Sequence, residues 1–106
     1  MSNFAGDVTP GRVKYVGGTL ITKVEQPLER VIGAAEESLK SLKFIDVNAK
    51  SDALKGRLTA IDADDKEITV TVDKEGSNLT KVQIRVGVLG EERVANAVWE
   101  EMENRL

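Results

Sequence analysis

The chain has 106 residues, of which 41% are hydrophobic and 31% charged, and its formal net charge is -3. These values predict one globular domain with its own core and exclude an intrinsically disordered protein. The sequence contains no cysteine and no histidine, which excludes disulfides, thiolate metal sites and the Ser-His and Cys-His nucleophile pairs.

The N-terminal quarter of the sequence predicts a tail and a strand. Residues 1–11 are polar and interrupted by glycine and proline, so we expect a flexible tail there, followed by a single α+β domain over residues 12–106. Within that domain, residues 12–25 alternate between apolar and polar side chains. This alternation predicts one strand, with a bulge or bend at Gly17-Gly18.

A helix follows this strand. Apolar residues at helical spacing run from Leu28 to Leu42. Pro27 suits the first turn of a helix, where its missing N–H costs no hydrogen bond. The acidic residues lead and the lysines follow, which is the order that the helix dipole favours.

Four short strands come next, each with apolar side chains at alternate positions. They are predicted over residues 44–50, 54–62, 67–74 and 79–88. In the first of them, Ile45, Val47 and Ala49 are expected on one side. The connections between the last three strands are short and rich in turn-forming residues, which favours antiparallel hairpins.

The chain ends in a second amphipathic helix, predicted over residues 91–106. Trp99 lies on its apolar stripe, a position more typical of a core residue than of an anchor for a partner or a membrane. Together the elements predict a two-layer α+β fold: an antiparallel sheet of four or five strands with both helices on one face, in the order β-α-β-β-β-β-α. No apolar run reaches the about 20 residues of a membrane-spanning helix.

Several motifs occur in a set order along the chain. They are Gly17-Gly18 before a strand, Pro27-Leu28-Glu29-Arg30-Val31 at a helix start, Asp52-Ala53-Leu54-Lys55-Gly56-Arg57 at a strand start, and Val82-Gln83-Ile84-Arg85-Val86-Gly87-Val88-Leu89-Gly90 before the last helix. In this order, over about residues 13–106, they resemble the small bacterial domain-of-unknown-function family 3568.

The resemblance implies a fold and a compartment. Members of that family are similar to short envelope lipoproteins, which typically carry a signal and a lipid-modified cysteine. Since the sequence shows neither, we expect a cytoplasmic protein as written, and an envelope protein if a leader has been removed. The resemblance implies no catalytic residues.

The side of the sheet that faces away from the predicted helices is the candidate binding surface. Strand alternation places basic and threonine side chains on it, namely Lys55, Arg57, Thr69, Thr71, Lys81 and Arg85. Such a surface could bind an acidic protein or another anionic ligand, or pair with a second copy of the chain. The alternative is that a one-sided sheet simply exposes long polar side chains to water.

Three other features have simpler structural interpretations. An acidic cluster contains Asp62, Asp64, Asp65 and Glu67. It could hold Ca²⁺, but it lacks the ordered pattern of a calcium loop and is typical of a solvated turn. The acceptor pattern Asn78-Leu79-Thr80 is likewise typical of a turn. Gly17-Gly18 precede a strand rather than a helix, which favours a backbone bend over a phosphate-binding loop.

These observations favour a non-enzymatic binding or accessory module that needs no metal or cofactor. The alternative is a small-molecule binding protein with a pocket between the helices and the sheet. Small core residues would leave room for it, namely Ala34, Ala35, Ala95 and Ala97. The negative net charge argues against nucleic acid as the partner, while a homodimer remains open.

Overall fold

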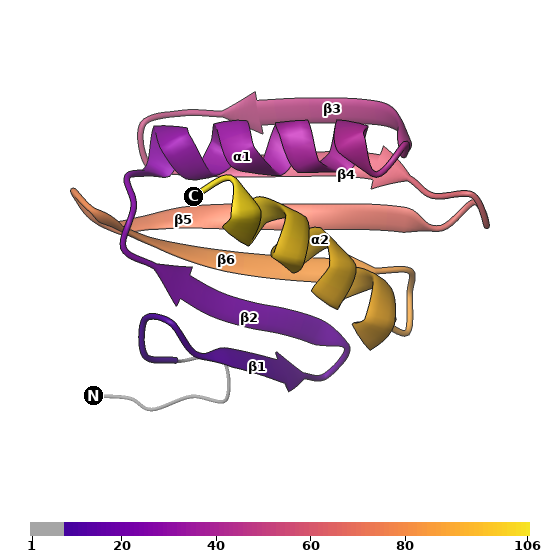
Figure 1. The fold of residues 1–106 in the computed structure, drawn as a ribbon, viewed down its shortest axis with the longest axis horizontal. Helices are drawn as coiled ribbons and strands as arrows, with labels where there is room; N and C mark the ends of the chain where they lie inside the picture. The colour runs from indigo at the N-terminus through magenta and orange to yellow at the C-terminus, as the bar shows by residue number, and fades with distance from the viewer. Residues whose placement is uncertain (1–7) are drawn as a thin grey trace.

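The computed structural model describes residues 8–106, which form two layers, a sheet and a pair of helices (Figure 1). In chain order the elements are β1 (Val13–Val16), β2 (Thr19–Val24), α1 (Leu28–Ser41), β3 (Ile45–Ser51), β4 (Lys55–Ile61), β5 (Glu67–Gly76), β6 (Leu79–Val86) and α2 (Glu92–Asn104). The part of the predicted tail that comprises residues 1–7 lies outside the described residues.

All six strands form one antiparallel sheet, in the spatial order β1-β2-β6-β5-β4-β3. The chain leaves β2 in one half of the sheet and crosses through α1 to β3, the far edge strand. It then returns strand by strand until β6 pairs with β2. The last strand therefore fills the space between the first hairpin and the rest of the sheet.

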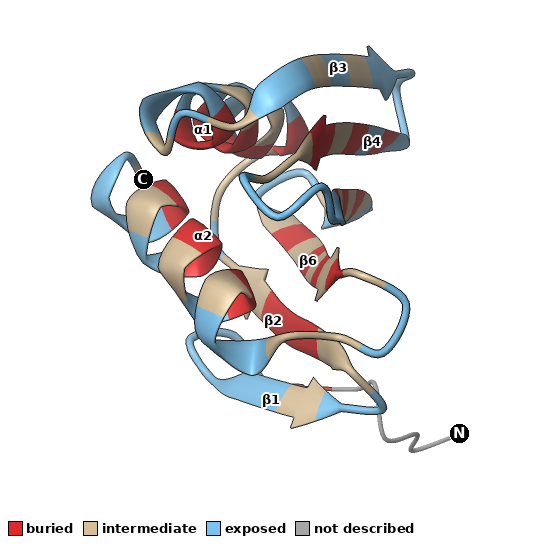
Figure 2. Cartoon of the chain, turned by 90° about the vertical axis from the view of Figure 1, so that its right-hand side faces the viewer, coloured by how far each residue is buried: buried red, intermediate tan, exposed pale blue. Residues whose placement is uncertain are grey.

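The core lies between the helices and one face of the sheet, which we call the inner face. Alternate residues of β4, β5 and β6 point into it, including Leu58, Val70 and Ile84, which are all fully buried. Helix α1 contacts β3, β4 and β5, and α2 contacts β6 and β2. The buried stripe of each helix faces the sheet (Figure 2), and Trp99 of α2 belongs to the core as predicted.

Helix α1 packs against β4 at a glycine of that strand. Gly56 is buried, and a Cβ atom added to it would lie 3.0 Å from Ile32 Cδ1 and 3.1 Å from Val72 Cγ2. The first of these belongs to the helix and the second to the neighbouring strand. The side chain of Ile32 thus occupies the volume that any larger residue at position 56 would need.

The α+β class and the two helices are confirmed, but the sheet has six strands rather than four or five. The difference arises at Gly17 and Gly18, where a bend within one long strand was predicted. Both residues have positive φ angles (59° and 86°), and they form the tight turn of a hairpin that joins β1 to β2. The observed order is therefore β-β-α-β-β-β-β-α, because two left-handed residues in succession reverse the chain instead of bending it.

The expected facing of β3 is wrong at its first residue. Asp46 has a φ of 55°, and the register shifts between Ile45 and Asn48. Val47 still packs against the core, as predicted. The irregularity turns Ile45 to the opposite face, where it pairs with Ile61 and is 60% exposed.

Within residues 8–106, neither helix has the length and apolar composition that crossing a membrane requires.

Candidate functional site

The other face of the sheet, which we call the outer face, is turned away from both helices and carries mostly polar side chains. Strand register places residues that are opposite one another on the same face. One row crosses all six strands and consists of Lys14, Ile21, Gln83, Thr71, Arg57 and Lys50. A shorter row beside it consists of Lys23, Lys81, Asp73 and Lys55.

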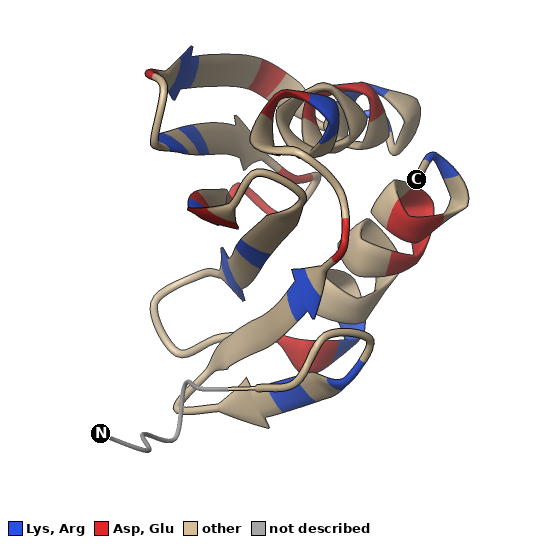
Figure 3. Ribbon diagram, turned by 90° about the vertical axis from the view of Figure 1, so that its left-hand side faces the viewer, with Lys and Arg blue, Asp and Glu red and all other residues tan. Residues whose placement is uncertain are grey.

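The structure brings the six predicted site residues onto this face. Arg57 lies opposite Thr71, and Thr69 lies opposite Arg85. Lys55 and Lys81 do not neighbour each other, because Asp73 of β5 stands between them. Figure 3 shows Lys and Arg on the strands, whereas α2 carries several acidic residues. The face is therefore mainly basic, and it also contains carboxylates that the sequence interpretation did not include, among them Asp73 and Glu75.

Arg85 was expected to offer a positive charge to a partner on the outer face, but its guanidinium is hydrogen-bonded within the protein. Its Nη1 donates hydrogen bonds to the carbonyl oxygen of Gly17 (2.7 Å) and to Thr19 Oγ1 (3.1 Å), and its Nη2 donates to the carbonyl oxygen of Val88. The guanidinium therefore ties the β1–β2 turn to the loop before α2. These bonds leave Arg85 as a structural residue at the border of the outer face.

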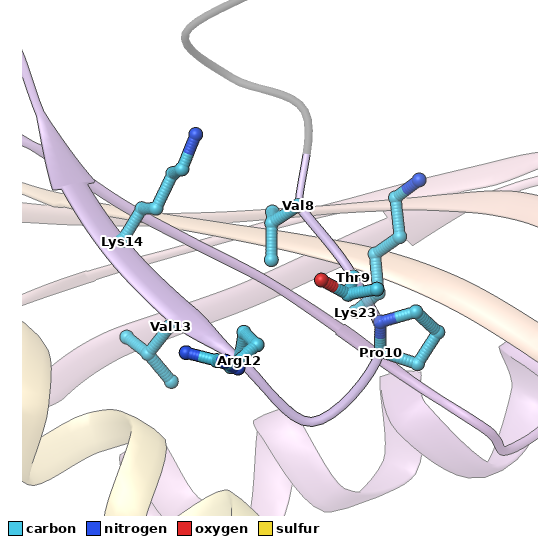
Figure 4. Close-up of a pocket in the computed structure, with 7 residues that line it drawn as sticks. All are labelled: Val8, Thr9, Pro10, Arg12, Val13, Lys14 and Lys23. Carbon is cyan, nitrogen blue, oxygen red and sulfur yellow. The ribbon is translucent and has the colours of Figure 1, made fainter.

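The β1–β2 end of the outer face is covered by the chain itself. Ile21 points outward yet is only 5% exposed, and Val8, which is 8% exposed, lies between Lys14 and Lys23 on the side of the sheet away from the helices (Figure 4). Both apolar residues lie outside the core cluster. Lys23 also forms an ion pair with Glu75 (2.8 Å). This end of the basic face is thus partly occupied by intramolecular contacts.

The β3–β6 part of the outer face is open and holds two neighbouring depressions. One, of about 280 Å³, is lined by Thr19, Arg57, Thr69, Thr71, Gln83 and Arg85. The other, of about 410 Å³, lies toward the β3–β4 turn and includes Lys50, Asp52 and Lys55. Arg57 and Thr71 line both depressions, so the two form one continuous surface.

The β3–β4 turn beside the larger depression is organised by a carboxylate. Asp52 Oδ1 accepts hydrogen bonds from the backbone N–H groups of Leu54 (2.8 Å) and Lys55 (3.0 Å). These two bonds, followed by the nearby Lys55 ammonium, lower the pKa of Asp52 below its ordinary value. The carboxylate therefore stays ionised and holds the turn that presents Lys55.

Sequence reasoning missed several members of this face. Lys14 was missed because the β1–β2 hairpin was not recognised, so its strand was not assigned to a face. Lys50 lies opposite Arg57, and strand alternation alone does not show that pairing. Lys23 and Asp73 could have been found, since each follows the alternation of a strand that was predicted.

The acidic hairpin has the geometry of a turn. Asp62 Oδ1 accepts hydrogen bonds from the backbone N–H groups of Asp64 and Lys66, both at 2.9 Å, and Asp65 has a φ of 65°. Across residues 8–106, no group of three or more acidic side chains is placed to hold a metal ion. These contacts match the solvated turn that the sequence favoured.

The alternative pocket between the helices and the sheet stays a prediction. Five depressions of the described surface are lined by strands and loops, and none of these five is lined by a residue of α1 or α2. Ala35 and Ala95 are fully buried in the core cluster. These five depressions lie on the outer face and on the loops at its ends.

Comparison with known proteins gives one family. A family model described as "Protein of unknown function (DUF3568)" matches residues 2–105. No curated protein matches the chain.

Proposed function

The chain belongs to the DUF3568 family of proteins of unknown function, and on that premise we propose that it is a non-enzymatic binding or accessory module that holds an acidic partner on the outer face of its sheet. The observation that carries the proposal is the set of cations on the open part of that face. Lys50, Lys55, Arg57 and Lys81 form no side-chain hydrogen bond or ion pair with any described residue.

The distribution of charge supports an acidic partner. The whole chain carries a net charge of -3, yet four cations without a described side-chain partner lie on the open outer face, where strand register adds the two carboxylates of Glu67 and Asp73. A basic face on an acidic protein orients an acidic partner toward that face during encounter. Hydroxyl and amide groups between the cations, at Thr69, Thr71 and Gln83, can hydrogen-bond the partner's polar groups.

The aromatic residues favour a polypeptide partner over single-stranded nucleic acid. The three aromatic residues of the described chain, Tyr15, Phe44 and Trp99, all pack against or within the core. Proteins that bind single strands usually stack bases on exposed aromatic side chains. The outer face binds through charge and hydrogen bonding instead, which suits an acidic polypeptide.

A binding assay with poly-L-glutamate tests the proposal. We expect binding that weakens as salt rises from about 50 to about 500 mM, because exposed charges are screened within about 10 Å at 0.1 M. The double variant Arg57→Glu/Lys81→Glu should abolish binding. It avoids Arg85, whose replacement would also disturb two loops.

The matched control is Arg93→Glu, which reverses an exposed cation on α2. It should bind poly-L-glutamate nearly as the parent does. Circular dichroism of all variants establishes that they remain folded. Equal affinity of the parent and the folded double variant would overturn the proposal.

A further inference from the structure

The depression at the β3–β4 turn concentrates positive charge on the open part of the outer face. Its polar lining consists of Lys50, Ser51, Asp52, Lys55, Arg57 and Thr71. Three of these residues are cations and one is an anion, so the lining carries two net positive charges. The depression itself has a volume of about 410 Å³. Thr71 adds a hydroxyl group that can donate a hydrogen bond.

Strand pairing places two of the cations against each other. Lys50 lies directly opposite Arg57, so their Cβ atoms are about 5 Å apart on the same face. Like charges in this position destabilise a sheet. An anion bound between the two side chains would remove that repulsion.

A second pair of the same kind shows how the repulsion is otherwise relieved. Lys23 lies directly opposite Lys81, but Glu75 lies 2.8 Å from the Lys23 ammonium and balances its charge. No described residue does this for Lys50 or Arg57. Asp52, the carboxylate that lines the depression, already accepts two backbone hydrogen bonds within its own turn.

We propose that this depression is an oxyanion site that takes a doubly charged phosphate group. Two net positive charges match a phosphate, which carries close to two negative charges at neutral pH. The guanidinium of Arg57 can bind two phosphate oxygens at once, and the ammonium groups of Lys50 and Lys55 can neutralise the rest. The site rests on the proposed function, since it would anchor the acidic partner through a phosphorylated side chain or take free phosphate.

NMR titration of the whole chain with inorganic phosphate tests the site. Backbone amide shifts should change around Lys50, Lys55, Arg57 and Thr71 and remain constant on α2. Since inorganic phosphate loses its second proton near neutral pH, binding should be tighter at pH 7.5 than at pH 5. Acetate, which has one charge, should bind much more weakly at the same concentration.

Two variants that each remove one positive charge separate a site from a general surface charge. Arg57→Gln should weaken phosphate binding about tenfold, because it removes a two-point charged contact. Arg93→Gln, on α2 and outside the depression, should leave it nearly unchanged. Equal effects of the two variants, or equal affinity for phosphate and acetate, would overturn the inference.

A third arm separates the sources of the phosphate and the two proposals. An acidic peptide with one phosphoserine should bind more tightly than inorganic phosphate if the anchor belongs to a polypeptide, and equally if free phosphate is the ligand. Poly-L-glutamate binding without phosphate binding would refute this site and leave the proposed function standing. Phosphate binding without poly-L-glutamate binding would refute the proposed function and leave this site standing.

Discussion

At the scale of single residues, two of the motifs that carry the family resemblance meet in one place. Gly17 and Gly18 lie beside the loop that contains Gly90, and a Cβ atom added to Gly90 would collide with the backbone of Gly18. Arg85 joins the same two segments through hydrogen bonds. Residues far apart in the sequence thus serve one structural junction, which explains why glycine occurs at both contact points.

Arg85 should therefore matter for stability more than for binding. Replacing it with methionine removes bonds to Gly17 and Val88, and bonds that involve a charged group contribute about 1.5–3 kcal/mol each. We expect Arg85→Met to lower the free energy of unfolding, measured in urea, by about 1–3 kcal/mol. Lys81→Met, on the same strand but without partners, is the control. A similar loss in both variants would contradict the junction.

Asp52 makes stability depend on pH at the β3–β4 turn. Its pKa is lowered in the folded protein by two backbone hydrogen bonds, so its contribution is present above the unfolded pKa of about 3.9. That contribution is lost as the pH falls through the lower folded pKa. A plot of unfolding free energy against pH should decline in this window for the parent and decline less for Asp52→Asn. An NMR titration that gives Asp52 an ordinary pKa would refute the expectation.

At the scale of elements, the periodicity of apolar residues predicted most of the helices and strands. It did not predict the turn and the bulge that depend on single dihedral angles. Both helices and the strands β4, β5 and β6 follow from apolar spacing. The β1–β2 hairpin depends on the left-handed conformation of Gly17 and Gly18. The facing of Ile45 in β3 depends on the left-handed conformation of Asp46. An apolar pattern alone does not distinguish a bend from a reversal, because both fit alternating side chains on either side of the glycines.

The contact between α1 and β4 can be tested at Gly56. Gly56→Val should destabilise the fold by about 1–3 kcal/mol, because the new side chain meets Ile32 and Val72 at close range. The double variant Gly56→Ala/Ile32→Val, which removes the nearest methyl group, should be more stable than Gly56→Ala alone. Thermal unfolding measures both comparisons.

The matched control lies on the same helix. Gly33 has open space where a Cβ atom would be added, and glycine within a helix is less favourable than alanine by roughly 0.5–1 kcal/mol. Gly33→Ala should therefore raise the unfolding temperature, whereas Gly56→Ala should lower it. Two shifts of the same sign would show that the helix does not rest on Gly56.

At the scale of the whole molecule, the sequence predicted which face of the sheet carries the candidate site. It did not predict where on that face the open cations lie. Alternation along β4, β5 and β6 assigns Lys55, Arg57 and Lys81 to the outer face without any coordinates. Lys50 lies opposite Arg57 because of the register of β3, and the bulge in β3 shifts that register. The burial of Ile21 and Val8 outside the core is likewise not visible in the alternation. Both are tertiary features, and they decide which cations remain open.

The order of strands also makes the sheet depend on its last member. β2 has only β1 and β6 as neighbours, so a chain that ends at Gly76 would leave the first hairpin detached. We expect this truncated protein to lack a cooperative unfolding transition. Chemical shift dispersion in its NMR spectrum would measure this directly, and a native-like spectrum would contradict it.

The pairing of β2 with β6 has a consequence for how the protein is made. Thr19 pairs with Arg85, so the first hairpin meets its partner only after most of the chain has left the ribosome. Such distant pairings slow folding, since a long loop must close before the contacts form. The exposed edge of β2 would stay unprotected throughout synthesis. Completion of the sheet is thus a late event in folding, and we expect a chaperone that shields the nascent hairpin to raise the yield of folded protein.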